Sequence, residues 1–282
     1  MSYTETSTST FLAENEYGSN LACIALEDEL VFVDAGLLTP YTTEFRERME
    51  ERFDREASTL IITHAHLDHI FGMDAFRDCE VVAARAGRPR FERFLSTEYD
   101  EAFISDRERV FPFFREAAET AALKSPDRWV EGETLLCEGE LVMKVIGGHS
   151  DCSSSIHFPR ERVLAAGDLL QVDRYPYFGE PDTDLGRWIN ALRSWQGMEL
   201  DALLPGHGRP VERSYLEGVG RFFEEMVEVV AELKAEGVAA EEVAGHPRIP
   251  SGYWPADAVK KPAYDFSIVN LYRRLYKYSA IS

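Results

Sequence analysis

Short apolar runs rich in β-branched residues recur along the chain and predict β-strands. They are Leu21–Leu26, Leu30–Asp34, Thr59–Thr63, Glu80–Ala84, Leu141–Ile146, Ser154–Phe158, Arg162–Ala166 and Ala202–Leu204. Between the strands, apolar residues at helical spacing predict helices over Tyr41–Arg55, Leu67–Phe76, Asp184–Trp195, Val211–Glu236 and Asp265–Tyr278. Two groups of strands with helices interspersed indicate an α/β protein of stacked sheets covered by helices. We expect the Ser/Thr-rich first ten residues to be frayed.

Residues 85–130 interrupt this pattern and are rich in Arg, Glu and Phe. We expect two or three helices here, inserted between strands as a cap that gives the substrate site an apolar wall. Ordinary helical packing is the alternative. The phenylalanines that would form the wall are Phe91, Phe94, Phe103, Phe111, Phe113 and Phe114. We expect residues 1–282 to form a single domain, with 211–282 as its C-terminal helical segment.

Composition narrows the classes of partner. The chain has 282 residues, of which 50 are acidic and 30 are Lys or Arg, giving a net charge of −20 that repels phosphate backbones and disfavours a nucleic-acid partner. No apolar run approaches the roughly 20 residues that a membrane span needs, and the N-terminus lacks the features of a secretory signal. We therefore expect a cytoplasmic protein with a small-molecule substrate and no membrane partner. A homodimer stays open.

The strongest chemical signal is Thr63-His64-Ala65-His66-Leu67-Asp68-His69, which follows an apolar strand and begins a helix. Alternate residues that leave a strand end can turn toward one point, so His64 and His66 can share a metal ion. Asp68 and His69 begin the helix and can face a second ion. Three of the seven histidines of the chain lie in this short run, so an incidental polar loop is a poor explanation.

Three further ligand candidates follow other predicted strands in the same way. Each comes directly after glycine, which lets the backbone turn sharply and approach a metal closely. They are His149 after Gly147-Gly148, Asp168 after Gly167, and His207 after Gly206. Strand ends that meet at one edge of a fold would gather all seven ligands. For His157 and His246, outside this pattern, a packed or surface position is the better interpretation.

Together these segments resemble the five-part signature of the metallo-β-lactamase superfamily. The stretch Val31-Phe32-Val33-Asp34-Ala35-Gly36 is similar to its first part, and the resemblance covers about residues 18–210. It implies a four-layer αββα sandwich of two mixed sheets, with a two-metal site at one edge. It also implies His64, His66 and His149 on the first metal, Asp68, His69 and His207 on the second, Asp168 bridging both, and Asp34 orienting the ligands.

The sequence departs from the family pattern after His149, where Cys152 in His149-Ser150-Asp151-Cys152 stands at a position usually held by glycine. This leaves the loop conformation open, and a direct metal role for Cys152 is the less favoured interpretation. The other cysteines, Cys23, Cys79 and Cys137, fit reduced thiols in apolar or strand-like surroundings. The commonest zinc β-lactamases carry Cys where Asp168 stands and lack the ligand at His69. The chain therefore looks more like the glyoxalase, lactonase and general hydrolase branches.

Such a ligand set predicts hydrolysis. Imidazole and carboxylate ligands suit Zn²⁺, with iron or manganese as alternatives. Two zinc ions can share a bridging hydroxide that attacks the carbonyl of an ester, thioester or lactone. Asp68 and Asp168 would hold this hydroxide. Tyr175 or Tyr177 would donate a proton to the leaving group or bond the carbonyl, although both tyrosines fit packing positions equally well.

One other reaction of the same fold stays open. A mononuclear iron dioxygenase acting on a persulfide would use His64, His149 and Asp168 alone. Such enzymes typically show an Arg-Thr-Asp-Phe-like stretch after the bridging Asp, where this chain has Gln171-Val172-Asp173-Arg174-Tyr175. A binding module without catalysis is disfavoured because no ligand is missing.

Overall fold

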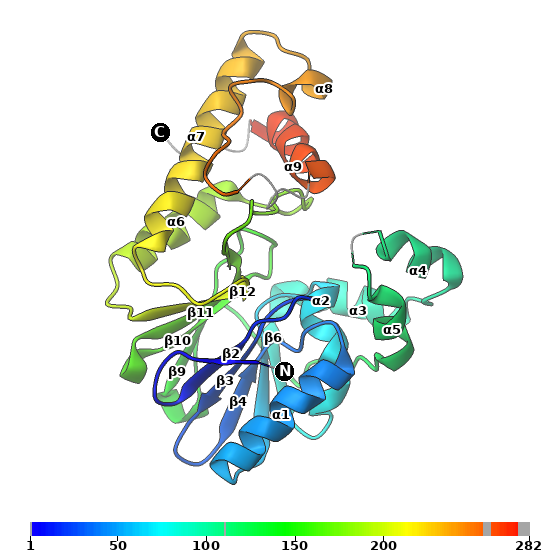
Figure 1. The fold of residues 1–282 in the computed structure, drawn as a ribbon, viewed down its shortest axis with the longest axis vertical. Coiled ribbons are helices and arrows are strands. Elements are labelled where there is room, and N and C mark those ends of the chain that lie inside the picture. Colours follow the sequence, from blue (N-terminus) through cyan, green and yellow to red (C-terminus); the bar gives the residue numbers. More distant parts are fainter. Residues whose placement is uncertain (1, 110, 256–260, 276–282) are drawn as a thin grey trace.

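The computed structural model describes residues 2–109, 111–255 and 261–275. Among these residues, two mixed β-sheets pack face to face and helices cover their outer faces, as Figure 1 shows. The first sheet has the order β1 (Thr4–Glu5), β2 (Thr10–Ala13), β3 (Leu21–Ala25), β4 (Leu30–Val33), β5 (Ala57–Ile62), β6 (Glu80–Ala84), β7 (Arg128–Val130). The second has the order β12 (Ala202–His207), β11 (Val163–Gln171), β10 (Ser154–Phe158), β9 (Leu141–Val145), β8 (Glu133–Leu136). The predicted αββα sandwich is confirmed.

The helices fall into three sets. The first sheet carries α1 (Thr39–Phe53), α2 (Leu67–Ile70) and a 3-10 helix, η1 (Phe71–Phe76). The segment 85–130 contains η2 (Arg85–Gly87), α3 (Arg88–Ser96), α4 (Glu101–Arg107) and α5 (Phe114–Thr120). The rest of the chain adds η3 (Cys137–Gly139), η4 (Pro159–Glu161), α6 (Leu185–Gln196), α7 (Tyr215–Ala235), α8 (Ala240–Val243) and α9 (Lys261–Arg274).

Strand β11 shows why the sheets stack. Its side chains alternate between the two faces, and both faces are buried. Val163 and Ala165 join the core between the sheets, whereas Leu164 and Ala166 join a second core. This second core includes Trp188 of α6 and Phe223 of α7, so these helices cover the outer face of the second sheet. On the opposite side, Phe45 of α1 packs edge-to-face on Phe32 of β4, at 5.8 Å between ring centroids.

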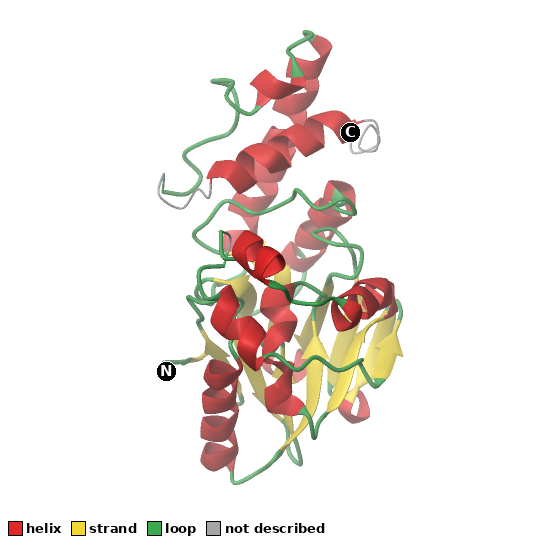
Figure 2. Ribbon diagram, turned by 90° about the vertical axis from the view of Figure 1, so that its right-hand side faces the viewer, coloured by secondary structure: helices red, strands yellow, loops and turns green. Residues whose placement is uncertain are grey.

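The C-terminal helices extend beyond the sandwich. Figure 2 shows α8, α9 and the C-terminal part of α7 extending beyond the sheets, at the end of the molecule opposite α1. Tyr264, Ile268 and Leu271 of α9 are buried in the same core as α7. The predicted last helix, Asp265–Tyr278, begins at Lys261 in the structure, and its last three residues lie outside the described residues. No helix among the described residues is both long and apolar enough to cross a membrane.

Two predictions about local structure are wrong. The first ten residues are not all frayed, because β1 pairs antiparallel with β2, and β2 pairs with β3. The Glu161 carboxylate fixes this hairpin by accepting hydrogen bonds from Ser9 Oγ at 2.8 Å and Ser9 N at 3.1 Å. In addition, two of the six phenylalanines predicted to form a substrate wall, Phe91 and Phe114, cannot do so, since both are fully buried in the core. Aromatic contacts hold them there: Phe91 packs on Trp129, and Phe114 packs on Phe71.

Candidate metal centre

The structure brings all seven predicted ligands to one edge of the sandwich. His64 follows β5 closely, His66 is the residue directly before α2, and Asp68 and His69 lie within that helix. On the other sheet, His149 lies in the turn between β9 and β10, Asp168 lies within β11, and His207 ends β12. A hydrogen bond from Ser154 N to Thr63 O (2.9 Å) joins the sheets beside the site.

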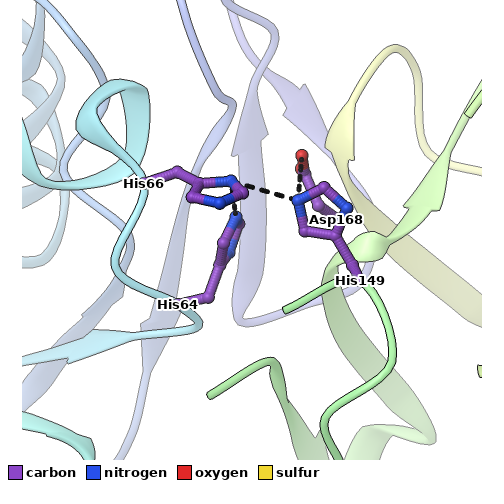
Figure 3. Close-up of side chains that lie close together, drawn as sticks. All are labelled: His64, His66, His149 and Asp168. Atoms are coloured by element: carbon purple, nitrogen blue, oxygen red, sulfur yellow. Dashed lines mark hydrogen bonds and ion pairs between the residues drawn. The ribbon is translucent and has the colours of Figure 1, made fainter. Parts of the chain in front are cut away.

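Three imidazoles converge to form the first group of ligands. His66 Nδ1 lies 3.0 Å from His64 Nε2 and 3.1 Å from His149 Nε2, and Figure 3 shows the rings pointing toward one another. Asp168 Oδ2 lies 3.5 Å from His149 Nε2 and completes the group. Burial, reinforced by the neighbouring imidazoles, holds the pKa of His64 and His66 well below its usual value, and burial also lowers that of His149. Neutral rings leave their lone pairs free for a cation.

Asp68, His69 and His207 form the second group. His207 Nε2 lies 3.3 Å from Asp68 Oδ2 and 3.4 Å from Asp168 Oδ1, and His69 Nε2 lies 3.2 Å from the same Asp168 oxygen. The Asp168 carboxylate therefore faces the first group with Oδ2 and the second with Oδ1. Burial alone would lower the pKa of His69, but the carboxylates of Asp34, Asp168 and Asp68 raise it well above its usual value.

The donors fit a bound metal. His69 Nε2 and Asp168 Oδ1 are both buried, and neither has a hydrogen-bond partner among the described residues. The two atoms lie 3.2 Å apart, but not in the geometry of a hydrogen bond. Buried polar atoms without partners cost about 1–3 kcal/mol each. A divalent cation between these atoms would satisfy them, and it would also relieve the crowding of three imidazole nitrogens in the first group. Imidazole and carboxylate donors together suit zinc, iron or manganese.

Hydrogen bonds behind the ligands select which ring nitrogen faces the site. His149 Nδ1 donates to the Tyr177 carbonyl oxygen (3.0 Å), which leaves Nε2 for a metal. The family resemblance implied that Asp34 orients the ligands. Its Oδ2 lies 2.8 Å from His69 Nδ1 and accepts a hydrogen bond from the Thr63 hydroxyl at 2.7 Å. Thr63 Oγ1 in turn lies 3.1 Å from His64 Nδ1. One carboxylate therefore supports a ligand of each group.

Gly206 is required by this arrangement. A Cβ atom at this position would lie 2.1 Å from Asp168 Oδ1 and 2.8 Å from the Gly167 backbone. No side chain can be accommodated at that separation, so any other residue would displace the bridging carboxylate. The glycine before His207 thus acts by close approach to Asp168.

The contacts of Tyr175 are with the C-terminal segment, which agrees with the packing position that the sequence left open. Its hydroxyl accepts a hydrogen bond from Gly252 N at 3.0 Å, and its ring packs against Trp254 and Tyr264 of the C-terminal segment. Tyr177 lies nearer the ligands, with its ring centroid 6.2 Å from that of His149. Burial, with a smaller effect of Glu180, raises the pKa of Tyr177 to about 12, so its hydroxyl keeps its proton near neutral pH.

Cys152 packs behind the site and belongs to neither ligand group. Its Sγ lies 3.4 Å from Ser150 Oγ and 3.5 Å from the backbone nitrogen of Ala65. The turn after His149 is closed by Ser153, whose hydroxyl accepts from Ser150 N at 2.9 Å. A small buried side chain is thus accommodated where the family pattern usually has glycine.

Two residues that sequence reasoning missed lie beside the first group. Glu180 Oε1 is 3.8 Å from His66 Nε2, and Arg90 of α3 lies against Glu180. Neither residue follows a strand or belongs to a motif. Nothing in their sequence context signals the contact, because it joins the inserted helix to the loop after β11.

Comparisons with known proteins agree with this geometry. A family model for the metallo-beta-lactamase superfamily matches residues 16–207. A metallo-beta-lactamase type 2 from Bacillus sp. (strain 170) is 25% identical over 192 residues, which cover 66% of this chain and 65% of that relative. The chain thus matches just under two thirds of the relative's length.

Solved structures share the fold. A metallo-beta-lactamase family protein from Thermus thermophilus superposes with a TM-score of 0.66 and 20% identity, covering 95% of this chain and 94% of that one. A stereoselective inverting sec-alkylsulfatase from Pseudomonas sp. superposes with a TM-score of 0.72 and 15% identity, covering 95% of this chain and 49% of that one. With the matched family model and the clustered His and Asp ligands, these findings show that the chain belongs to the metallo-β-lactamase superfamily of metallo-hydrolases.

Proposed function

We propose that this chain is a dinuclear, zinc-dependent hydrolase of a small ester, thioester or lactone. The observation that carries the proposal is the Asp168 carboxylate, which directs one oxygen to each of two ligand groups. When bound, a pair of divalent cations lowers the pKa of water toward roughly 7 and polarises the carbonyl of the substrate. A mononuclear site would leave Asp68, His69 and His207 gathered in the interior without a role.

The chain's own residues prepare this chemistry. His64, His66 and His149 are neutral, so they can coordinate without first losing a proton. Asp68 and Asp168 are the carboxylates that would accept a hydrogen bond from the attacking water. Tyr177 is the remaining candidate for a hydrogen-bond donor to the carbonyl or the leaving group, because its hydroxyl stays protonated and lies on the His149 side of the site.

A substrate screen with metal analysis in parallel tests the proposal. The purified protein would be offered thioesters, lactones, aryl esters and phosphodiesters, together with a β-lactam and a secondary alkyl sulfate, since proteins named for those substrates share its fold. We expect about two zinc ions per chain and turnover of an acyl substrate. Two anomalous-scattering peaks at the zinc edge, bridged by Asp168, would support the dinuclear assignment.

The screen also separates the alternative reaction. A persulfide dioxygenase would bind one iron through His64, His149 and Asp168 and would consume oxygen. One iron per chain with oxygen uptake, and no hydrolysis of any acyl substrate, would replace the present proposal with that one.

A further inference from the structure

His66 differs from the other histidines of the first group in what lies behind its ring. His64 Nδ1 has the Thr63 hydroxyl at 3.1 Å, and His149 Nδ1 has the Tyr177 carbonyl oxygen at 3.0 Å. The outer nitrogen of His66, Nε2, is buried and has no hydrogen-bond partner among the described residues. The acceptor that faces it is Glu180 Oε1, at 3.8 Å. This separation is too long for a hydrogen bond and lies about 0.6 Å beyond the range in which one forms.

Glu180 is held in this place by groups from other parts of the chain. Arg90 Nη1 lies 3.2 Å from Glu180 Oε2, while Arg90 Nη2 donates to Asp182 Oδ2 at 2.8 Å. The guanidinium therefore bridges two carboxylates of the loop after β11. Arg274 of α9 donates to the Glu180 backbone oxygen at 2.7 Å. The Glu180 and Arg90 side chains are only 22% and 15% exposed, so solvent screens their charges weakly.

We propose that Glu180 is a positioning residue for the first metal group: its carboxylate faces His66 Nε2 and, through its negative charge, favours the tautomer with a proton on Nε2, which directs the Nδ1 lone pair at the metal. The inference rests on the proposed metal centre and deepens it. A carboxylate behind a ligating imidazole fixes its tautomer and orientation and raises its basicity. Arg90 orients the carboxylate through its second oxygen. Without Glu180, the same guanidinium would keep only Asp182 as a carboxylate partner, and less negative charge would lie beside the cation-binding ring.

The arrangement also assigns a role to the insertion. Helix α3 supplies Arg90, and the loop after β11 supplies Glu180, so the orientation of one ligand depends on two segments outside the sheets. The helical insertion thus reaches the metal centre through an ion pair, a contact separate from its buried phenylalanines.

The test isolates the first group. In a His207→Ala background, which disables the second group, zinc and cobalt affinities are measured by competition with a chelator. We expect Glu180→Gln to weaken binding about tenfold, because the amide keeps an oxygen of the same reach but lacks the negative charge. Glu180→Ala should weaken binding about 100-fold, near the upper end of effects seen for such outer partners. The matched control is Glu92→Gln on α3, whose side chain pairs with Arg88 and is 60% exposed. Its affinity should stay within twofold.

Two further readouts separate positioning from simple bracing of the loop. Without metal, the Glu180→Gln protein should unfold at the same temperature as its parent. When both proteins are loaded with Co²⁺, the absorption spectrum of the variant should differ from that of the parent, because the basicity of one ligand has changed. Unchanged affinity in Glu180→Ala would overturn the inference. A lowered unfolding temperature together with an unchanged Co²⁺ spectrum would overturn it as well. If the parent itself bound no metal, the proposed function would fail instead.

Discussion

The two ligand groups are neighbours joined by one carboxylate, yet their protonation chemistry is opposite. The first group consists of three imidazoles whose pKa values are lowered, chiefly by burial. In the second group, burial also disfavours the charged form, but nearby carboxylates outweigh it and raise the pKa values of His69 and His207. The first group is therefore a neutral set of donors, whereas the histidines of the second group, beside buried carboxylates, keep their protons to higher pH when no metal is bound.

The opposite pKa shifts of the two groups indicate how the same site can compensate its buried carboxylates without metal and still bind a metal ion. Where His69 and His207 are protonated, their positive charge compensates the carboxylates of Asp34, Asp68 and Asp168 as a metal cation would. Binding a metal in the second group must then release protons, while the first group can coordinate without doing so. We expect the first group to fill before the second when metal is scarce.

Removing the shared carboxylate should have the largest effect. Asp168→Ala deletes the ligand common to both groups and leaves any two cations facing each other unscreened. Loss of metal assistance worth several kcal/mol corresponds to a fall in kcat/KM of roughly 10³-fold or more. Steady-state kinetics with metal analysis would check this. Near wild-type turnover in Asp168→Ala would show that the two groups are not coupled through this residue.

Asp34→Asn should affect the groups unequally. Asn tolerates the left-handed backbone at this position, where φ is 60°, so the turn should survive. The direct partner of Asp34 is His69, and its link to His64 runs through the neutral Thr63 hydroxyl. We therefore expect a roughly 10- to 100-fold loss of metal affinity in the second group and a smaller loss in the first. Calorimetric titration that resolves the two steps provides the measurement, and equal losses at both steps would remove the distinction drawn here.

Acidification should empty the second group first. A raised pKa means that the histidine holds its proton up to higher pH, so protons compete with the metal there as pH falls. Below the raised pKa, each displaced proton costs about tenfold in apparent affinity per pH unit. The first group should change less over the same range, since its imidazoles are already neutral. Metal content after dialysis at a series of pH values would show one ion lost before the other. Simultaneous loss of both would contradict the comparison.

The sequence was a good guide wherever a ligand closely follows a strand or glycine. His64, His149, Asp168 and His207 could be placed together because strand ends and their glycines are local features. The predicted strands over 80–84 and 154–158 have the same bounds in the structure.

Features that depend on distant partners could not be predicted in this way. The N-terminal hairpin looked frayed because its Ser and Thr side chains meet their acceptor, Glu161, only in the folded chain. Likewise, Tyr175, Tyr177 and Glu180 occupy one loop after β11. Only the folded chain shows that the Tyr175 hydroxyl accepts a hydrogen bond from Gly252 N, whereas the Glu180 carboxylate faces His66 Nε2.

The smallest effect is expected for Tyr175→Phe, which should leave both ligand groups unchanged. The Tyr175 hydroxyl bonds only an exposed backbone nitrogen, that of Gly252, among the described residues, and water can replace it there. The change should lower the free energy of unfolding by about 0.5–1.5 kcal/mol and leave kcat/KM within about twofold. Tyr177→Phe is the matched variant: there we expect roughly a tenfold or greater loss of kcat/KM if its hydroxyl bonds the reacting group. Chemical denaturation and steady-state kinetics on both variants would decide the matter. A large loss of turnover in Tyr175→Phe at unchanged stability would return Tyr175 to the reacting centre and show that its position in the C-terminal packing is not the one used in catalysis.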